Sequence, residues 1–218
     1  MKFFFPTSTG VHTRELKGLE KLKAKLPAHY YGFANLELIE PQKKIGRQID
    51  IVLITEDRII LVDIKDWHGS ITSENSIWYQ NGKHRGISPV NKIADNARLV
   101  ADKLKAHLKR HRGSSGISAP MIHSAVVMTG TADYSSLDEG QKSRIFQIDK
   151  FCQILSSTRS MNDNLGKVYG RVNLFDKSLE WKGILKRFFT NTSAEFKAQD
   201  KLFDGHKITS DAIFSHPT

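Results

Sequence analysis

Residues 48 to 65 limit most strongly what this chain can fold into, because they carry charged side chains inside two apolar strands. Both halves of the segment are rich in β-branched and aliphatic residues, which is typical of β-strands. The polar sequence Thr-Glu-Asp-Arg at 55 to 58 predicts the turn of an antiparallel hairpin between them. Asp50, Asp63 and Lys65 interrupt the apolar pattern and therefore need a physical reason to be there.

The position of the turn predicts how the two strands pair. A turn symmetric about the Glu56–Asp57 bond places Asp50 opposite Asp63, whereas an odd-length loop would make them diagonal neighbours. Because side chains alternate along a strand, one face should carry Asp50, Val52, Ile54, Ile59, Leu61, Asp63 and Lys65, and the other Ile49, Ile51, Leu53, Ile60, Val62 and Ile64. Both faces are apolar, so we expect both to be covered by other elements.

Two opposed carboxylates on an apolar surface repel each other and lose hydration. A divalent metal ion between Asp50 and Asp63, with Lys65 nearby, removes this conflict. The alternative is that the two acids lie at the edge of the sheet, each paired with an arginine or lysine of this basic chain. The sequence leaves both interpretations open and favours the metal site.

Composition narrows the class of protein. The 218 residues suffice for one sizeable α/β domain with a short appendage, and the net charge of +10 favours a polyanionic partner such as nucleic acid. The single cysteine, Cys152, excludes an internal disulfide framework and a cysteine-based zinc site, and it suits a reducing cytoplasm. No apolar run approaches transmembrane length. We therefore expect a cytoplasmic protein without a membrane partner, whose oligomeric state is open, a homodimer included.

The first helix is predicted over residues 13 to 26, from Thr13 as the N-cap to the stop at Pro27. Helical phase aligns Glu15 with the apolar residues Leu19, Leu22 and Leu26 and turns Glu20 away from them. An inward acid at this position either belongs to a site or complements the helix dipole.

The remaining pattern is that of an α/β domain with a central mixed sheet flanked by helices. Asn81-Gly82 suits the positive backbone angles of a tight hairpin turn. We predict strands at 34 to 40, 70 to 73 and 121 to 129, and helices at 91 to 111, 149 to 156 and 179 to 189.

Basic residues gather in a loop after the first strand and along the long helix. They either form solvated faces with favourable helix-end charges or contact phosphates. The candidate nucleic-acid-binding residues are Lys43, Lys44, Arg47, Lys92, Lys103, Lys109 and Arg110.

Several motifs together resemble a known family. The inward Glu15, Asp50 and Asp63-Ile-Lys65 look like the Glu, Asp and (Asp/Glu)-x-Lys positions of the PD-(D/E)xK phosphodiesterase superfamily. The motifs Arg14-Glu15, Gln48-Ile-Asp-Ile-Val-Leu, Ile60-Leu-Val-Asp-Ile-Lys-Asp-Trp-His-Gly69, Trp78 with Asn81-Gly82, and Ser88-Pro89 resemble more narrowly the nuclease-related domain, NERD. The third-strand acid is more usually glutamate in that family, and Asn91 or Lys92 stands where many members have glutamine.

This resemblance implies a restriction-endonuclease-like core and an antiparallel catalytic hairpin. It implies a Mg²⁺- or Mn²⁺-dependent nuclease with Glu15, Asp50, Asp63 and Lys65 as catalytic residues. Asp50, Asp63 and the Ile64 carbonyl would bind the metal, with Glu15 binding directly or through water. Such oxygen ligands suit hard cations. Trp67 and His68 have ordinary roles, as a packing aromatic and a surface histidine.

We therefore expect a nuclease-like domain at residues 1 to 160, and a C-terminal extension or linker at 161 to 218 that leads to a further domain in a longer protein. The expected function is hydrolysis of DNA, with RNA as a second substrate class, in an anti-phage defence or DNA-processing protein. The alternative is a non-catalytic nucleic-acid-binding or targeting module of a multidomain protein.

Overall fold

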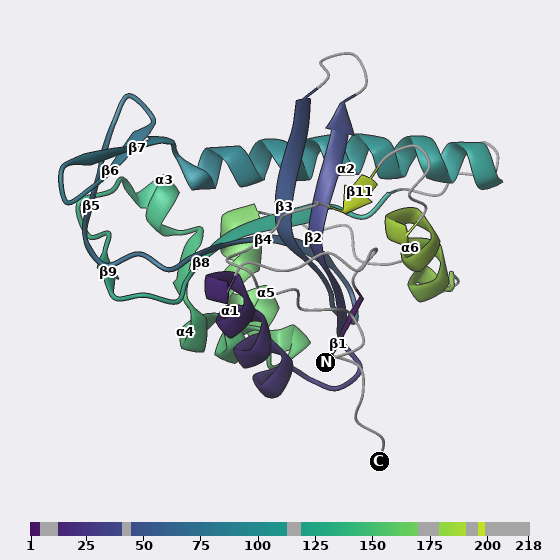
Figure 1. Cartoon of the computed structure of the whole chain (residues 1–218). Coiled ribbons are helices and arrows are strands. Elements are labelled where there is room, and N and C mark those ends of the chain that lie inside the picture. The colour runs from purple at the N-terminus through teal and green to yellow at the C-terminus, as the bar shows by residue number, and fades with distance from the viewer. Residues whose placement is uncertain (5–12, 41–44, 113–118, 170–178, 191–195, 199–218) are drawn as a thin grey trace.

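The computed structural model describes residues 1–4, 13–40, 45–112, 119–169, 179–190 and 196–198 (Figure 1). Its strands are β1 (Lys2–Phe4), β2 (Tyr31–Glu40), β3 (Ile45–Ile54), β4 (Ile59–Lys65), β5 (Gly69–Glu74), β6 (Ile77–Gln80), β7 (Lys83–Ile87), β8 (Ile122–Met128), β9 (Ala132–Asp133), β10 (Ile145–Gln147) and β11 (Phe196–Ala198). Its helices are α1 (Thr13–Lys25), α2 (Pro89–Arg112), α3 (Glu139–Lys142), α4 (Ile148–Ile154), α5 (Thr158–Tyr169) and α6 (Trp181–Thr190).

The main sheet is mixed, in the order β1-β2-β3-β4-β8-β10, and β11 also pairs with β2. Strands β3 and β4 are antiparallel, and Ile51 pairs with Val62, which confirms the predicted register around a symmetric turn. On its other side β4 pairs in parallel with β8, from Ile59 to Lys65. Strand β4 is therefore an inner strand of the sheet, and Asp63 lies one residue past its last pair with β3.

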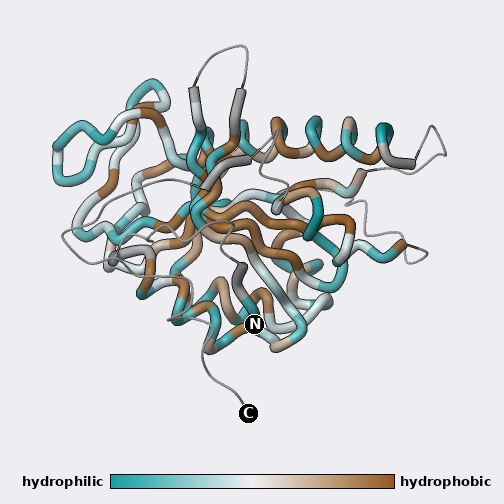
Figure 2. The backbone as a smooth tube through the Cα atoms, turned by 45° about the vertical axis from the view of Figure 1, so that its right-hand side comes forward, coloured by the Kyte–Doolittle hydropathy of each residue, from teal (hydrophilic) through white to brown (hydrophobic). Residues whose placement is uncertain are grey.

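Both faces of the main sheet are covered, as the two apolar faces predict. Helices α2 and α6 pack on one face, and α1, α4 and α5 pack on the other. Figure 2 shows the hydrophobic strands in the middle, with polar positions recurring along the outer side of α2. The mixed α/β fold with an antiparallel hairpin flanked by helices is thus confirmed.

The predicted alternation fails at one position in β3. Ile51 packs on the α1 face, but Ile49 packs with Val52 on the α2 face, so its assignment to the Ile51 face is wrong. The cause lies opposite Asp50, where Asn35 adopts the left-handed conformation with φ of 58°. This residue reverses the alternation in β2, and β2 and β3 bend there (Figure 1).

The β6–β7 turn confirms the second predicted hairpin, because Asn81 and Gly82 have φ angles of 49° and 73°. This hairpin belongs to a separate four-stranded sheet, in the order β7-β6-β5-β9. The small sheet continues directly from the main one, since β4 leads into β5 and β8 leads into β9.

Two helices beyond residue 160, α5 and α6, pack on the same cores. The boundary expected between residues 160 and 161 falls inside α5, whose Met161 and Leu165 are buried with α1 and α4. Helix α6 contributes Phe188 and Phe189 to the opposite core. Both helices are therefore integral to the packing of the sheet.

A buried polar cluster lies at the opposite end of β4 and β8 from Lys65. Arg58 is fully buried, and its guanidinium donates to both carboxylate oxygens of Asp57 at 2.7 Å and to Asn162 of α5. His123, also fully buried, lies near this charge. Burial, followed by the repulsion from Arg58, lowers the pKa of His123 to about 4.

Acid should therefore destabilise the protein through His123. The unfolded chain binds this proton near pH 6.5, whereas the folded chain binds it only near pH 4, so stability falls as the pH drops between these values. We expect a slope of about 1 kcal/mol per pH unit from this group. Urea unfolding from pH 7 to 4.5 should show a shallower decline for His123→Gln than for the wild type. A His84→Gln control, altered at an exposed position, should match the wild type.

The close approach of α1 to β4 depends on Gly18. A Cβ atom there would lie 3.0 Å from Ile64 Cδ1, so any side chain forces Ile64 to shift, and a large side chain forces the largest shift. Gly18→Leu should lower the free energy of unfolding by about 1 to 3 kcal/mol. Lys17→Leu, at the exposed neighbouring position, serves as the control. Equal unfolding midpoints for the two variants would contradict this packing.

Candidate active site

The last three residues of β4 gather oxygen atoms around one cation. The Lys65 Nζ atom lies 2.8 Å from each carboxylate oxygen of Asp63 and also donates to the Ile64 carbonyl at 3.3 Å. The side chains of Asp63 and Lys65 are only 17% and 24% exposed, so water screens their interaction incompletely. Three oxygens of two consecutive residues thus converge on a single positive charge.

Asp50 is held against the same strand end by its own hydrogen bond. Its carboxylate, in a residue only 8% exposed, accepts the Ile64 N–H at 2.8 Å. The β3–β4 ladder ends just before this point, at Ile51 and Val62. The register would next bring the Ile64 N–H to the Ile49 carbonyl, and the Asp50 carboxylate takes that place. Asp50 is therefore fixed beside the peptide that links Asp63 to Ile64.

Glu15 lies in the first turn of α1, and its side chain is outside the described part of the structure. Three residues later, Gly18 packs against Ile64, so the start of α1 runs near the end of β4. Among the side chains that are described, no three His, Cys, Asp or Glu residues are grouped closely enough to hold a metal ion. Convergence of Glu15 with Asp50 and Asp63 stays a prediction.

The donor set at the end of β4 fits a hard divalent cation. Carboxylate and backbone carbonyl oxygens are the ligands that Mg²⁺ and Mn²⁺ prefer. The buried Oδ2 atom of Asp63 lies 2.8 Å from the Lys65 ammonium and meets no other described donor. A carboxylate oxygen with one neighbouring donor retains a lone pair that can coordinate an ion. Asp63, the Ile64 carbonyl and Asp50 are the residues that could hold one.

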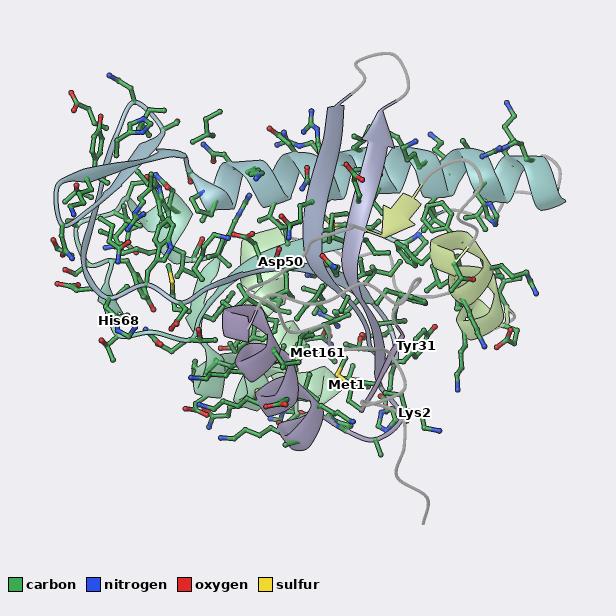
Figure 3. The ribbon with its side chains drawn as sticks, in the orientation of Figure 1. Met1, Lys2, Tyr31, Asp50, His68 and Met161 are labelled. Atoms are coloured by element: carbon green, nitrogen blue, oxygen red, sulfur yellow. The ribbon has the colours of Figure 1, made fainter. Side chains whose placement is uncertain are left out.

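The loop after β4 is packed tightly against the loop after β8. The Thr129 N–H donates to the Lys65 carbonyl at 3.0 Å, and the Thr129 hydroxyl lies 3.3 Å from the Asp66 carboxylate. The His68 ring contacts Thr131, and any Cβ at Gly130 would overlap the carbonyl of Trp67. Figure 3 shows His68 out beside β9. These contacts restrain the chain that carries Lys65 out of the sheet.

The predicted nucleic-acid-binding residues that the structure describes are spread along α2 and β3. Lys92 is exposed in the first turn of α2, and Lys109 and Arg110 are exposed near its end, roughly 27 Å away at 1.5 Å per residue. Arg47 and Lys103 are half-buried. Lys43 and Lys44 lie outside the described residues, so nothing places them near the others.

The sequence interpretation missed one pairing next to this site. The Arg85 guanidinium lies over the ring of Trp67, with its Cζ atom 5.9 Å from the ring centroid. The sequence pattern predicts only packing for Trp67 and no role for Arg85. The alternating strand pattern gives no sign of this contact, because it depends on an irregularity in β7.

Comparison with known proteins finds one family model and a curated relative. The model of the nuclease-related domain, NERD, matches residues 11–129, a range that covers more than half of the chain and contains the positions of the four candidate catalytic residues. A curated relative is the probable kinase PglW of Streptomyces coelicolor, 24% identical over 152 residues. That match covers 67% of this chain and 9% of the relative, so the chain corresponds to a small part of that protein. No described helix is long and apolar enough to span a membrane.

Two substitutions of Asp50 can distinguish its hydrogen bond with the Ile64 N–H from the effect of its negative charge. Asp50→Ala leaves a buried N–H without its acceptor and should cost about 1 to 3 kcal/mol of unfolding free energy. Asp50→Asn retains an acceptor oxygen and should cost clearly less. Urea denaturation at pH 7 measures both values. If the two variants are equally stable, the hydrogen bond does not hold the strand end.

Proposed function

Because the chain belongs to the nuclease-related domain (NERD) family, we propose that it hydrolyses phosphodiester bonds of nucleic acid, DNA before RNA, with the help of a divalent cation. The observation that carries this proposal is the convergence of the Asp63 carboxylate and the Ile64 carbonyl on one cation. The net charge of +10 supports a polyanionic substrate.

In this proposal Asp63, Asp50 and the Ile64 carbonyl hold Mg²⁺ or Mn²⁺, and Glu15 completes the ligand set directly or through water. A bound ion of this kind polarises the scissile phosphate and lowers the pKa of a bound water. The hydrogen bond from Ile64 to Asp50 keeps that carboxylate in place before any ion arrives. The protein therefore does not have to reorganise β3 against β4 to build the site.

Lys65 supplies the positive charge that the reaction needs. Its ammonium neutralises Asp63 at 2.8 Å, and engagement of that carboxylate by an ion would release it toward the substrate. There the ammonium would stabilise charge that develops on the phosphate or position the attacking water. Only the neutral amine, after loss of its own proton, could instead take a proton from that water. The Thr129 N–H bond to the Lys65 carbonyl restrains the backbone from which this side chain extends.

A second candidate function is a nucleic-acid-binding or targeting module without catalysis. The Asp63–Lys65 ion pair favours it, because the pair is electrically neutral without any metal. The match to a small part of a long probable kinase also suits a module that works when joined to other domains. Under either function, we propose a role in a larger anti-phage defence or DNA-processing protein.

Removing either member of the ion pair should abolish cleavage. Asp63→Ala and Lys65→Ala should each lower the rate of DNA hydrolysis with Mg²⁺ or Mn²⁺ by at least about a hundredfold. EDTA should stop the wild type, and added Mg²⁺ should restore it. Gel assays on single-stranded, duplex and branched DNA and on RNA measure these rates.

The matched control is Lys150→Ala, which removes an exposed lysine on α4 and should leave the rate unchanged. Cleavage by Asp63→Ala at the wild-type rate would reject the proposed site. Metal-independent binding without any cleavage, equally strong in Lys65→Ala, would support the non-catalytic module instead.

A further inference from the structure

The small sheet adjoins the candidate active site through two connections. Strand β4 continues into β5 only four residues after Lys65, and β8 continues into β9. The two continuations pair with each other in parallel, with Gly69 opposite Ala132. Figure 1 shows the small sheet at the end of the main sheet, beside the start of α2. A ligand bound on this sheet would therefore lie next to the end of β4.

A β-bulge gives the small sheet an unusually placed arginine. Tyr79 pairs with His84, but Trp78 pairs with Gly86, so Arg85 is the extra residue on β7. Gly86 has a φ of 92°, a conformation that other residues rarely adopt. Bulges redirect side chains out of the regular alternation. Here Arg85 lies over Trp67, in the loop that follows the candidate catalytic strand.

Trp67 packs against a buried aromatic ring and is partly exposed to solvent. Its ring meets the ring of Trp78 at a centroid distance of 6.0 Å. Trp78 is fully buried and donates its indole N–H to Gln141 of α3. Trp67 itself is only half-buried, and Arg85 is exposed. An aromatic ring and a guanidinium are thus preorganised at the surface, two residues along the chain from Lys65.

The charge of the β6–β7 hairpin suits a phosphate backbone. Residues 77 to 87 include Lys83, His84 and Arg85 but no acid, and all three basic residues are exposed. The Tyr79 ring packs edge-on against His84 across the strand pair. Cations interleaved with aromatic rings bind nucleotides by stacking on bases and pairing with phosphates.

We propose that Trp67 and Arg85 bind an unpaired nucleotide of the strand whose phosphate lies at Lys65, so that the preferred substrate is single-stranded nucleic acid. This inference rests on the proposed function for the position of the scissile phosphate. Bases in a duplex stack on one another and leave no face for a protein ring, whereas unpaired bases stack readily on aromatic or guanidinium groups. The platform formed by Trp67 and Arg85, so close to the end of β4, therefore selects nucleic acid with unpaired bases.

Tryptophan fluorescence tests this binding without requiring catalysis. The chain has three tryptophans, and Trp78 and Trp181 are 0% and 6% exposed, so quenching by a stacked base reports mainly on Trp67. Wild-type protein in EDTA should be quenched by a single-stranded oligothymidylate and not by a blunt duplex of equal length. Trp67→Phe should bind the same oligonucleotide but lose the quenching.

Fluorescence anisotropy with the same labelled oligothymidylate measures affinity. Arg85→Ala and Trp67→Ala should each weaken binding about tenfold. Arg159→Ala, which removes an exposed arginine on α5 on the other face of the main sheet, should bind like the wild type. Circular dichroism spectra identical to the wild type would show that each variant is folded.

Three outcomes would overturn the inference: equal quenching by duplex, unchanged affinity of Arg85→Ala, or no binding of any nucleic acid. The first two results are distinct from a failure of the proposed function. Quenching that depends on Trp67, in a protein that cleaves nothing with Mg²⁺ or Mn²⁺, would support the platform and reject the hydrolase. Metal-dependent cleavage at equal rates by the wild type and Arg85→Ala would reject the platform and support the hydrolase.

Discussion

The hydrogen bond between the Ile64 N–H and the Asp50 carboxylate is the contact on which the candidate site depends. Strand β3 leaves β4 at this point, and the separation would leave a buried backbone N–H without an acceptor. A side chain that replaces the missing carbonyl lets the two strands diverge without that penalty. The Asp50 carboxylate replaces that carbonyl and also carries a negative charge, so the group that accepts the Ile64 N–H places an acid beside Asp63. Asp50 thus has both a structural role and a candidate role in the site.

The divergence of β3 from β4 originates in the neighbouring strand β2. Asn35 lies in the left-handed region opposite Asp50, and the side-chain alternation of both strands reverses there. Beyond the reversal, β2 and β3 run across α2, and Asn96 of that helix donates to the Gln48 carbonyl. The apolar residues beyond the bend, Leu36 and Ile49 among them, then join the α2 core. The bend is therefore stabilised by burial on the side to which it turns.

Much of this architecture follows from local rules in the sequence. The register of β3 and β4 could be predicted because a symmetric polar turn fixes it, and the covered faces followed from their apolar alternation. The position of Ile49 could not be predicted, because the alternation of side chains assumes regular strands and gives no sign of a left-handed residue. The strands β9 and β10 have two and three residues and are too short to show a period.

The same limit applies to the candidate site. Asp50, Asp63 and Lys65 were recognisable because charges stand out in apolar strands. The bond from Ile64 to Asp50 was not recognisable, because it requires the ladder to stop where a regular hairpin would continue. The pairing of Arg85 with Trp67 depends on a bulge between distant segments. The sequence pattern thus identified the charged residues of the candidate site. The contacts that these residues make depend on irregularities of the backbone, which the pattern does not show.

These irregularities also connect the two parts of the molecule. The carbonyl of Lys65 is bonded to the Thr129 N–H, and Gly130 leaves room for the backbone of Trp67. Displacement of Trp67 therefore presses on the loop that restrains Lys65, since these groups are close-packed and cannot move independently. In the proposed function, the loop that would bind a nucleotide through Trp67 is thus packed against the loop that restrains the backbone of Lys65.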